Sequence, residues 1–89
     1  MRYVMVSADF PDVTSAQRDK IYDCLGKKNW TKFTNISRDI STSWLGYFSS
    51  EVSEQSALET SKRIFIDCSK LYTTPKLALH FGNNKPTIY

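Results

Sequence analysis

The chain has 89 residues, of which 40% are hydrophobic and 24% charged, and a net charge of +3. These values are typical of one small globular domain and exclude fibrous and disordered classes, while the charge is too small to indicate a nucleic-acid partner by itself. No apolar stretch approaches the roughly 20 residues of a membrane-spanning helix, and the N-terminus lacks the apolar region of a signal peptide, so we expect a cytoplasmic protein without a membrane partner.

Residues 2–8 alternate two sets of mostly apolar side chains, which is the period of a strand with two different faces. This pattern favours a central strand that helices cover on one side. Asp9 follows at the end of the strand, and Pro11 bends the chain back. A carboxylate in this position can hold a metal ion, accept a proton from a ribose hydroxyl or cap the next turn.

Thr14 begins a helix that we expect over residues 14–26. Together with Gln17, three positions later, it has the pattern of a capping box, which satisfies two otherwise unpaired backbone amides. Apolar residues recur at helical spacing as far as Leu25. Gly26 is placed to end the helix, where a left-handed residue is needed.

Two strands are expected next, over residues 29–38 and 44–49. The first is rich in threonine, aromatic and β-branched residues. In the second, alternation places Trp44, Gly46 and Phe48 on one face.

The second half of the chain predicts a helix, a strand and a short edge strand. The helix begins at the cap Ser53 and ends near Lys70. Alternating residues 77–81 form the next strand. Residues 85–89 can return as an edge strand, since Pro86 is tolerated only at the edge of a sheet.

This order of elements predicts an α+β fold, the ferredoxin-like βαββαβ sandwich, in which two helices cover one face of a four-stranded antiparallel sheet. The first and third strands are central, so we expect Tyr3, Met5, Trp44 and Phe48 to meet on the face away from the helices. Such a face can stack the bases of single-stranded RNA, pack against a second copy or another protein, or lie under the C-terminal tail. The sequence leaves these three alternatives open.

Asp9 and Asp12 are the candidate metal ligands. Two carboxylates three residues apart across a turn can coordinate Mg²⁺ and leave positions open for a phosphate. Either residue can equally cap the following helix. A structural role is the better interpretation for Asp12, whereas for Asp9 the structural and functional interpretations are balanced.

Three further side chains are candidates for catalysis beside Asp9. Arg18 and Lys20 lie one turn into the first helix, where they can hold a phosphate or simply be solvated. His80 is the only histidine, and acid–base cleavage of RNA favours a group that titrates near neutrality. A lone histidine on an edge strand is more often a surface residue.

Residues 27–38 contain four positive charges, no acid and two aromatic residues, which is typical of a track for a single nucleic-acid strand. The alternative is a solvated edge strand that its lysines protect from aggregation. The candidate nucleic-acid-binding residues are Lys27, Lys28, Trp30, Lys32, Phe33 and Arg38, together with Trp44 and Phe48 of the third strand.

The two cysteines, Cys24 and Cys68, are too few and too far apart for a zinc knuckle or a disulfide-rich secreted scaffold. We expect both to be buried thiols. A Ser-His-Asp order, a Cys-His pair, a glycine-rich phosphate loop and an HExxH motif are absent from the sequence, which excludes the hydrolase classes that depend on them.

The six residues 6–11, Val-Ser-Ala-Asp-Phe-Pro, resemble the Val-Ser-x-Asp-aromatic-Pro opening of the GhoS-type endoribonuclease antitoxins. These are small ferredoxin-like proteins related in architecture to the Cas2 nucleases of CRISPR systems. The likeness continues in outline through a helix ending before Asn29, a strand with an aromatic near Phe48, and a second helix ending in Cys68. It covers the whole chain as topology, and its close part is the six-residue motif.

The resemblance implies cleavage or binding of RNA, since GhoS-type proteins silence a toxin message. It also implies that a homodimer places Asp9 near its symmetry mate, as in Cas2 proteins. Asp9 occupies the matching position at the end of the first strand, and the basic helix residue of the family falls nearest Lys20. The resemblance does not fix roles for Arg18 or His80.

Two hypotheses of different classes therefore follow from the sequence. The first is a small endoribonuclease of the antitoxin type that acts on single-stranded RNA, with Asp9 as base or metal ligand. The second is a non-catalytic interaction module, such as a phage or mobile-element protein that docks on and inhibits a nuclease or defence complex.

Overall fold

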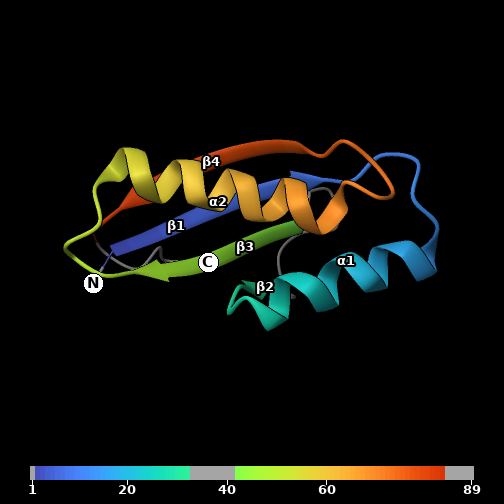
Figure 1. Ribbon diagram of the computed structural model, residues 1–89, viewed down its shortest axis with the longest axis horizontal. Helices are drawn as coiled ribbons and strands as arrows, with labels where there is room; N and C mark the ends of the chain where they lie inside the picture. Colours follow the sequence, from blue (N-terminus) through green and yellow to red (C-terminus); the bar gives the residue numbers. More distant parts are fainter. Residues whose placement is uncertain (1, 33–41, 84–89) are drawn as a thin grey trace.

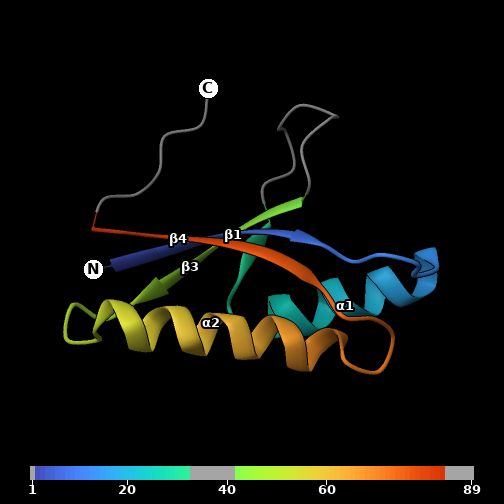
Figure 2. The same ribbon diagram turned by 90° about the horizontal axis from the view of Figure 1, so that it is seen from above.

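Within residues 2–32 and 42–83, four strands and two helices follow one another in the order β1-α1-β2-β3-α2-β4 (Figure 1). The computed structural model describes residues 2–32 and 42–83. The bounds are β1 Arg2–Asp9, α1 Ser15–Lys27, β2 Thr31–Lys32, β3 Thr42–Phe48, α2 Glu54–Ser69 and β4 Lys76–Gly82. The sheet has the order β2-β3-β1-β4 with antiparallel neighbours, and both helices cover the same face (Figure 2). The predicted ferredoxin-like architecture is confirmed.

β1 is one of the two central strands, paired with β3 on one side and β4 on the other. Its residues Val4, Val6 and Ala8 are buried beneath the helices, whereas Tyr3 and Met5 on the opposite face are partly exposed. The alternation read from the sequence therefore separates a core face from an open face.

The strand register places the third-strand aromatics on the other face from the one expected. Trp44 pairs with Val6, and Phe48 pairs with Arg2. Because directly opposite residues of an antiparallel pair point to the same side of the sheet, both aromatics lie on the helix-covered face. The prediction that they join Tyr3 on the open face is wrong, since alternation groups residues by face without telling which face is covered.

Both helices begin at the predicted caps. The Thr14 hydroxyl accepts a hydrogen bond from the Gln17 backbone N–H at 3.1 Å, and the Gln17 side chain accepts one from the Thr14 N–H at 3.0 Å. The Ser53 hydroxyl accepts from the Ser56 N–H at 3.2 Å. Each cap pairs an amide that the first helical turn leaves without a partner.

The end of α1 differs from its prediction. The helix runs past Gly26, and the left-handed residue is Asn29, with φ of 68°. Asparagine tolerates this region better than most residues with a side chain. The turn is closed by a hydrogen bond of 3.1 Å from the Trp30 N–H to the Leu25 carbonyl. It directs the next side chain, Trp30, into the core.

Aromatic side chains fill the space between the helices and the sheet. Phe65 of α2 is fully buried, and its ring meets Trp30 edge-on at a centroid distance of 4.9 Å and Trp44 at 6.2 Å. Such T-shaped pairs are favourable beyond the area that they bury.

Gly46 of β3 lies directly against the indole of Trp30. A Cβ atom there would lie 2.8 Å from two ring carbons and 2.9 Å from a third. We expect Gly46→Ala to lower the free energy of unfolding by about 1–3 kcal/mol, because overpacking a filled core outweighs the gain in strand propensity. Urea unfolding of both proteins measures the difference.

Gly26→Ala is the matched control for this substitution. A Cβ at Gly26 has no atom within 4 Å, and the residue is helical, so alanine should stabilise the protein by up to about 1 kcal/mol. Equal effects of the two alanines would contradict the steric explanation.

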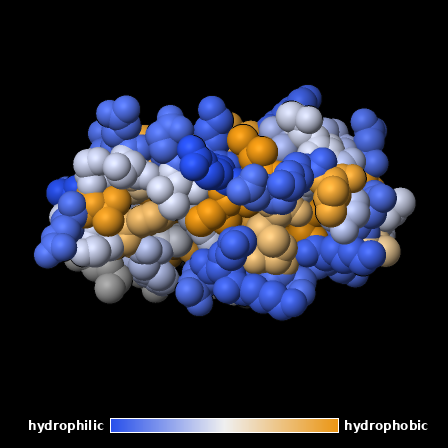
Figure 3. Space-filling model, viewed as in Figure 1, coloured by the Kyte–Doolittle hydropathy of each residue, from blue (hydrophilic) through white to orange (hydrophobic). Residues whose placement is uncertain are grey.

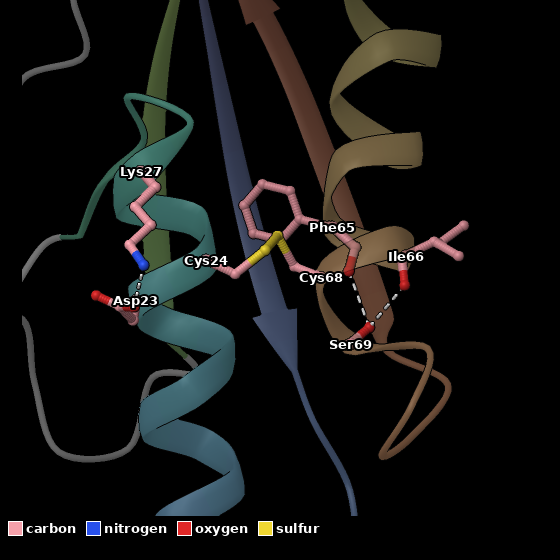
Figure 4. Close-up of a disulfide and its surroundings, with 7 residues drawn as sticks. All are labelled: Asp23, Cys24, Lys27, Phe65, Ile66, Cys68 and Ser69. Carbon is pink, nitrogen blue, oxygen red and sulfur yellow. Dashed lines mark hydrogen bonds and ion pairs between the residues drawn. A yellow bond between two sulfur atoms is a disulfide. The ribbon is translucent and has the colours of Figure 1, made fainter.

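Cys24 of α1 and Cys68 of α2 form a disulfide, with a Cα–Cα distance of 5.7 Å (Figure 4). The prediction of two buried thiols is wrong. Because α1 and α2 lie side by side on one face of the sheet, two residues that are 44 positions apart come within the range that a disulfide spans.

The helix-bearing face of the molecule is largely hydrophilic, with separated hydrophobic areas (Figure 3). Among residues 2–32 and 42–83, neither helix has the length and apolar character needed to cross a membrane. The predicted continuation of the second strand over residues 33–38 and the edge strand over 85–89 lie outside the described residues.

Candidate functional site

Asp9 is the last residue of β1, and its side chain is exposed. The neighbouring Phe10 is buried in the core. The following turn is tied to the α2–β4 connection by a hydrogen bond of 2.8 Å from the Thr73 hydroxyl to the Pro11 carbonyl. A buried anchor and a long-range hydrogen bond thus hold the backbone on which the Asp9 carboxylate stands at the end of the sheet.

Asp9 and Arg18 line one hollow of about 180 Å³, together with Ala8, Phe10 and Tyr22. Arg18 reaches it from the first turn of α1, where its N–H donates to the Thr14 carbonyl at 2.9 Å. The hollow has room for several water molecules, and two of its lining residues, Asp9 and Arg18, are exposed to solvent. We call it the Asp9 hollow.

Lys76 adds a second cation that sequence reasoning missed. It is the first residue of β4 and stands directly opposite Asp9 in the sheet register. The Cβ atoms of such a pair lie about 4.5–5.5 Å apart, so the ammonium can reach the carboxylate or a bound anion. Only the register between β1 and β4 could have revealed this pairing, and a single sequence does not contain it.

Lys20 lies elsewhere. It lines a different hollow of about 350 Å³ with Asp23, Cys24, Lys27 and Lys28. Two positions along a helix correspond to about 200° of rotation, so Lys20 and the arginine of the Asp9 hollow leave α1 on nearly opposite sides. Lys27 makes an ion pair with Asp23 at 3.1 Å.

Asp12 stands at the tip of the turn with φ of 61°. Aspartate is one of the few residues that occupy this region readily, and its side chain is exposed outside the Asp9 hollow. In the part of the chain that the structure describes, no group of three or more His, Cys, Asp or Glu side chains is placed to hold a metal ion. Mg²⁺ bound by Asp9 and Asp12 with help from a substrate phosphate stays a prediction.

Most of the predicted RNA-binding aromatics belong to the core. Trp30 and Trp44 are only 5% and 2% exposed, so neither can stack on a base unless the core opens. Phe48 is half-buried with its ring 6.4 Å from Trp30. Lys32 places its ammonium 4.4 Å from the centroid of the Tyr22 ring, a cation–π contact. Phe33 and Arg38 lie outside the described residues.

His80 is exposed on the open face, opposite Met5. It follows Lys76 by four strand residues, which corresponds to about 13 Å. The structure therefore does not bring His80 to the Asp9 hollow.

The open face presents a different aromatic pair from the one expected. Tyr3 and Tyr47 meet edge-on with ring centroids 5.0 Å apart, and Tyr47 is 45% exposed. Leu45, which shares this face, is buried. The accessible aromatic surface therefore centres on the two tyrosines.

No protein-family model matches the chain, and neither a curated protein nor a solved structure is significantly similar to it. A function for the Asp9 hollow must therefore be argued from the chemistry of its own residues.

Proposed function

We propose that this protein is a small endoribonuclease of the antitoxin type that acts on single-stranded RNA at the Asp9 hollow. The observation that supports the proposal is that Asp9 and Arg18, an exposed acid and an exposed base, line the same hollow. Lys76 stands opposite the carboxylate. These groups match the base and the cations that phosphodiester cleavage requires.

In the proposed reaction Asp9 accepts the proton of a ribose 2′-hydroxyl. The 2′-oxygen then attacks the adjacent phosphorus, and the bond to the 5′-oxygen of the next nucleotide breaks. The leaving 5′-oxygen takes a proton from water, so the products are a 2′,3′-cyclic phosphate and a 5′-hydroxyl. Arg18 can donate two parallel hydrogen bonds to the phosphoryl oxygens as charge develops on them, with Lys76 as a further cation.

The flanking strand is proposed to follow exposed cations and the open face. Lys27 and Lys28 extend from the C-terminal end of α1, and Tyr3 and Tyr47 offer rings on which bases can stack. An antitoxin of this type acts on the messenger RNA of a toxin, so the proposed role belongs to the cytoplasm. Disulfides in the cytoplasm are mostly transient or redox-sensing. In that compartment the Cys24–Cys68 bond would therefore be exposed to reduction by cellular thiols.

Cleavage of a fluorogenic single-stranded RNA by the purified protein tests the proposal. We expect Asp9→Asn to lower the rate by about 10²–10⁴-fold, the usual contribution of a positioned base. Arg18→Gln should lower it by about 10²–10³-fold, as for loss of a donor to a developing negative charge. Both side chains are exposed, so thermal unfolding should change little.

Asp19→Asn is the matched control, because Asp19 is an exposed acid beside Arg18 that does not line the Asp9 hollow. Its rate should equal that of the unmodified protein. The product ends and the metal requirement together distinguish the two roles of Asp9. Formation of a cyclic phosphate in EDTA indicates that Asp9 acts as a base. Cleavage that requires Mg²⁺ indicates that it acts as a metal ligand. Absence of cleavage under both conditions would refute the enzyme proposal.

The second candidate is the non-catalytic interaction module, and the tyrosine pair of the open face favours it. Tyr3 and Tyr47 give an amphipathic surface of the kind enriched in protein interfaces. This surface can hold a second copy or an inhibited nuclease. Two results together would favour this candidate. The protein would not cleave RNA, and Tyr47→Ala would change its mass in solution from that of a dimer to that of a monomer.

A further inference from the structure

We propose that the Cys24–Cys68 disulfide is a site of exchange with small anionic thiols of the glutathione type, and that the incoming thiolate attacks the sulfur of Cys24. The inference stands on the surroundings of the two sulfurs. It does not depend on the proposed ribonuclease activity.

The two half-cystines differ in access. Cys24 is half-buried and lines the hollow of about 350 Å³ on the outer side of α1. Cys68 is 8% exposed and belongs to the core cluster, on the same buried stripe of α2 as Phe65 (Figure 4). Because exchange needs an approach to the sulfur under attack, the open side of the bond is Cys24.

Positive charge surrounds the accessible sulfur. Lys20 and Lys28 lie four positions before and after Cys24, and Lys27 lies three positions after it, so all three are neighbours of Cys24 on the helix surface. Lys27 is paired with Asp23 at 3.1 Å. No ion pair is found for Lys20 or Lys28 within residues 2–32 and 42–83, so their charges are available to an incoming anion.

The exchange balances in two steps. A thiolate R–S⁻ forms a bond to the Cys24 sulfur, the Cys24–Cys68 bond breaks, and Cys68 leaves as a thiolate that takes a proton from water. A second thiolate then attacks the sulfur of the R group. It forms the small-molecule disulfide RSSR and releases Cys24 as a thiolate, so that the protein is reduced by two electrons and the two thiols are oxidised.

The consequence for the fold is local. The bond is the covalent link between α1 and α2, and α1 also carries Arg18 of the Asp9 hollow. Reduction would leave α1 held by noncovalent contacts, which include those of the buried residues Ile21 and Leu25. The ratio of reduced to oxidised small thiols would thereby determine whether α1 is covalently linked to α2.

The test compares the reduction rates of the intact protein by an anionic thiol, glutathione, and a cationic thiol, cysteamine. Each rate is divided by the rate of the same thiol with neutral hydroxyethyl disulfide, which removes differences in intrinsic reactivity. At about 0.01 M ionic strength, where the Debye length is about 30 Å, we expect the anionic thiol to be favoured about tenfold. At about 1 M, where it is about 3 Å, this preference should disappear.

Lysine variants and trapping of the mixed disulfide test whether the preference for the anionic thiol arises from the lysines around Cys24. Lys20→Gln with Lys28→Gln should lower it to about twofold, whereas the charge-matched pair Lys62→Gln with Arg63→Gln on α2 should leave it near tenfold. Early quenching with N-ethylmaleimide should give glutathione on Cys24 and the maleimide on Cys68. Equal rates for the two thiols at low salt, or glutathione trapped mainly on Cys68, would overturn the proposal even if a variant failed to fold.

Discussion

Replacing Cys24 and Cys68 together with alanine is expected to lower the free energy of unfolding by about 4 kcal/mol. On the chain-entropy account a cross-link stabilises by restricting the unfolded state, and a loop of 44 residues corresponds to about this value. A domain of 89 residues has a total stability of roughly 4–13 kcal/mol. The doubly substituted protein should therefore be close to the limit of folding, and guanidinium unfolding at low temperature measures the loss.

Unmodified protein in dithiothreitol is the matched control, because it loses the cross-link and keeps both sulfur atoms. Its loss of stability should be similar to that of the alanine pair, with any excess in the variant due to the space left at buried Cys68. A loss below about 1 kcal/mol in both would mean that the bond constrains the unfolded chain very little.

Phe65→Ala is expected to cost about 3–5 kcal/mol of unfolding free energy, the usual range for a fully buried phenylalanine. The ring contacts Trp30 and Trp44 edge-on, so its removal also ends two aromatic pairs. Far-UV circular dichroism during thermal unfolding measures the effect. A clear fall in the melting temperature is expected.

Phe65→Leu separates loss of volume from loss of aromatic contact, because it keeps most of the apolar side chain and removes the ring. We expect its cost to be well below that of alanine. Ile66→Ala on the exposed side of the same helix, where the side chain is 37% exposed, should cost little. Equal losses at Phe65 and Ile66 would contradict the assignment of the core face of α2.

The features that a few neighbouring residues determine were predictable from the sequence. The capping box of Thr14 and Gln17 and the cap at Ser53 place both helix starts, and the buried residues of α2 follow the helical period that the sequence displays. The order of strand and helix patterns then leaves the ferredoxin-like sheet as the natural topology.

The features that depend on tertiary register were not predictable. Trp44 faces the helices because it pairs with Val6. The disulfide depends on how α1 lies against α2. At the Asp9 hollow, the sequence named Arg18 and Lys20 without telling them apart, because the rotation of α1 relative to the end of β1 decides which of the two residues lines the hollow.

β1 leaves the ribosome before β3 and β4, its two neighbours in the sheet. Val6 pairs with Trp44, 38 positions on, and with Leu79, 73 positions on. Until β4 has been synthesised, the nascent chain carries an apolar strand with an unpaired edge, the kind of segment that associates with other chains. Folding of this domain must therefore be completed after translation of β4. A chaperone that binds the nascent chain before then would find an edge of β1 unpaired.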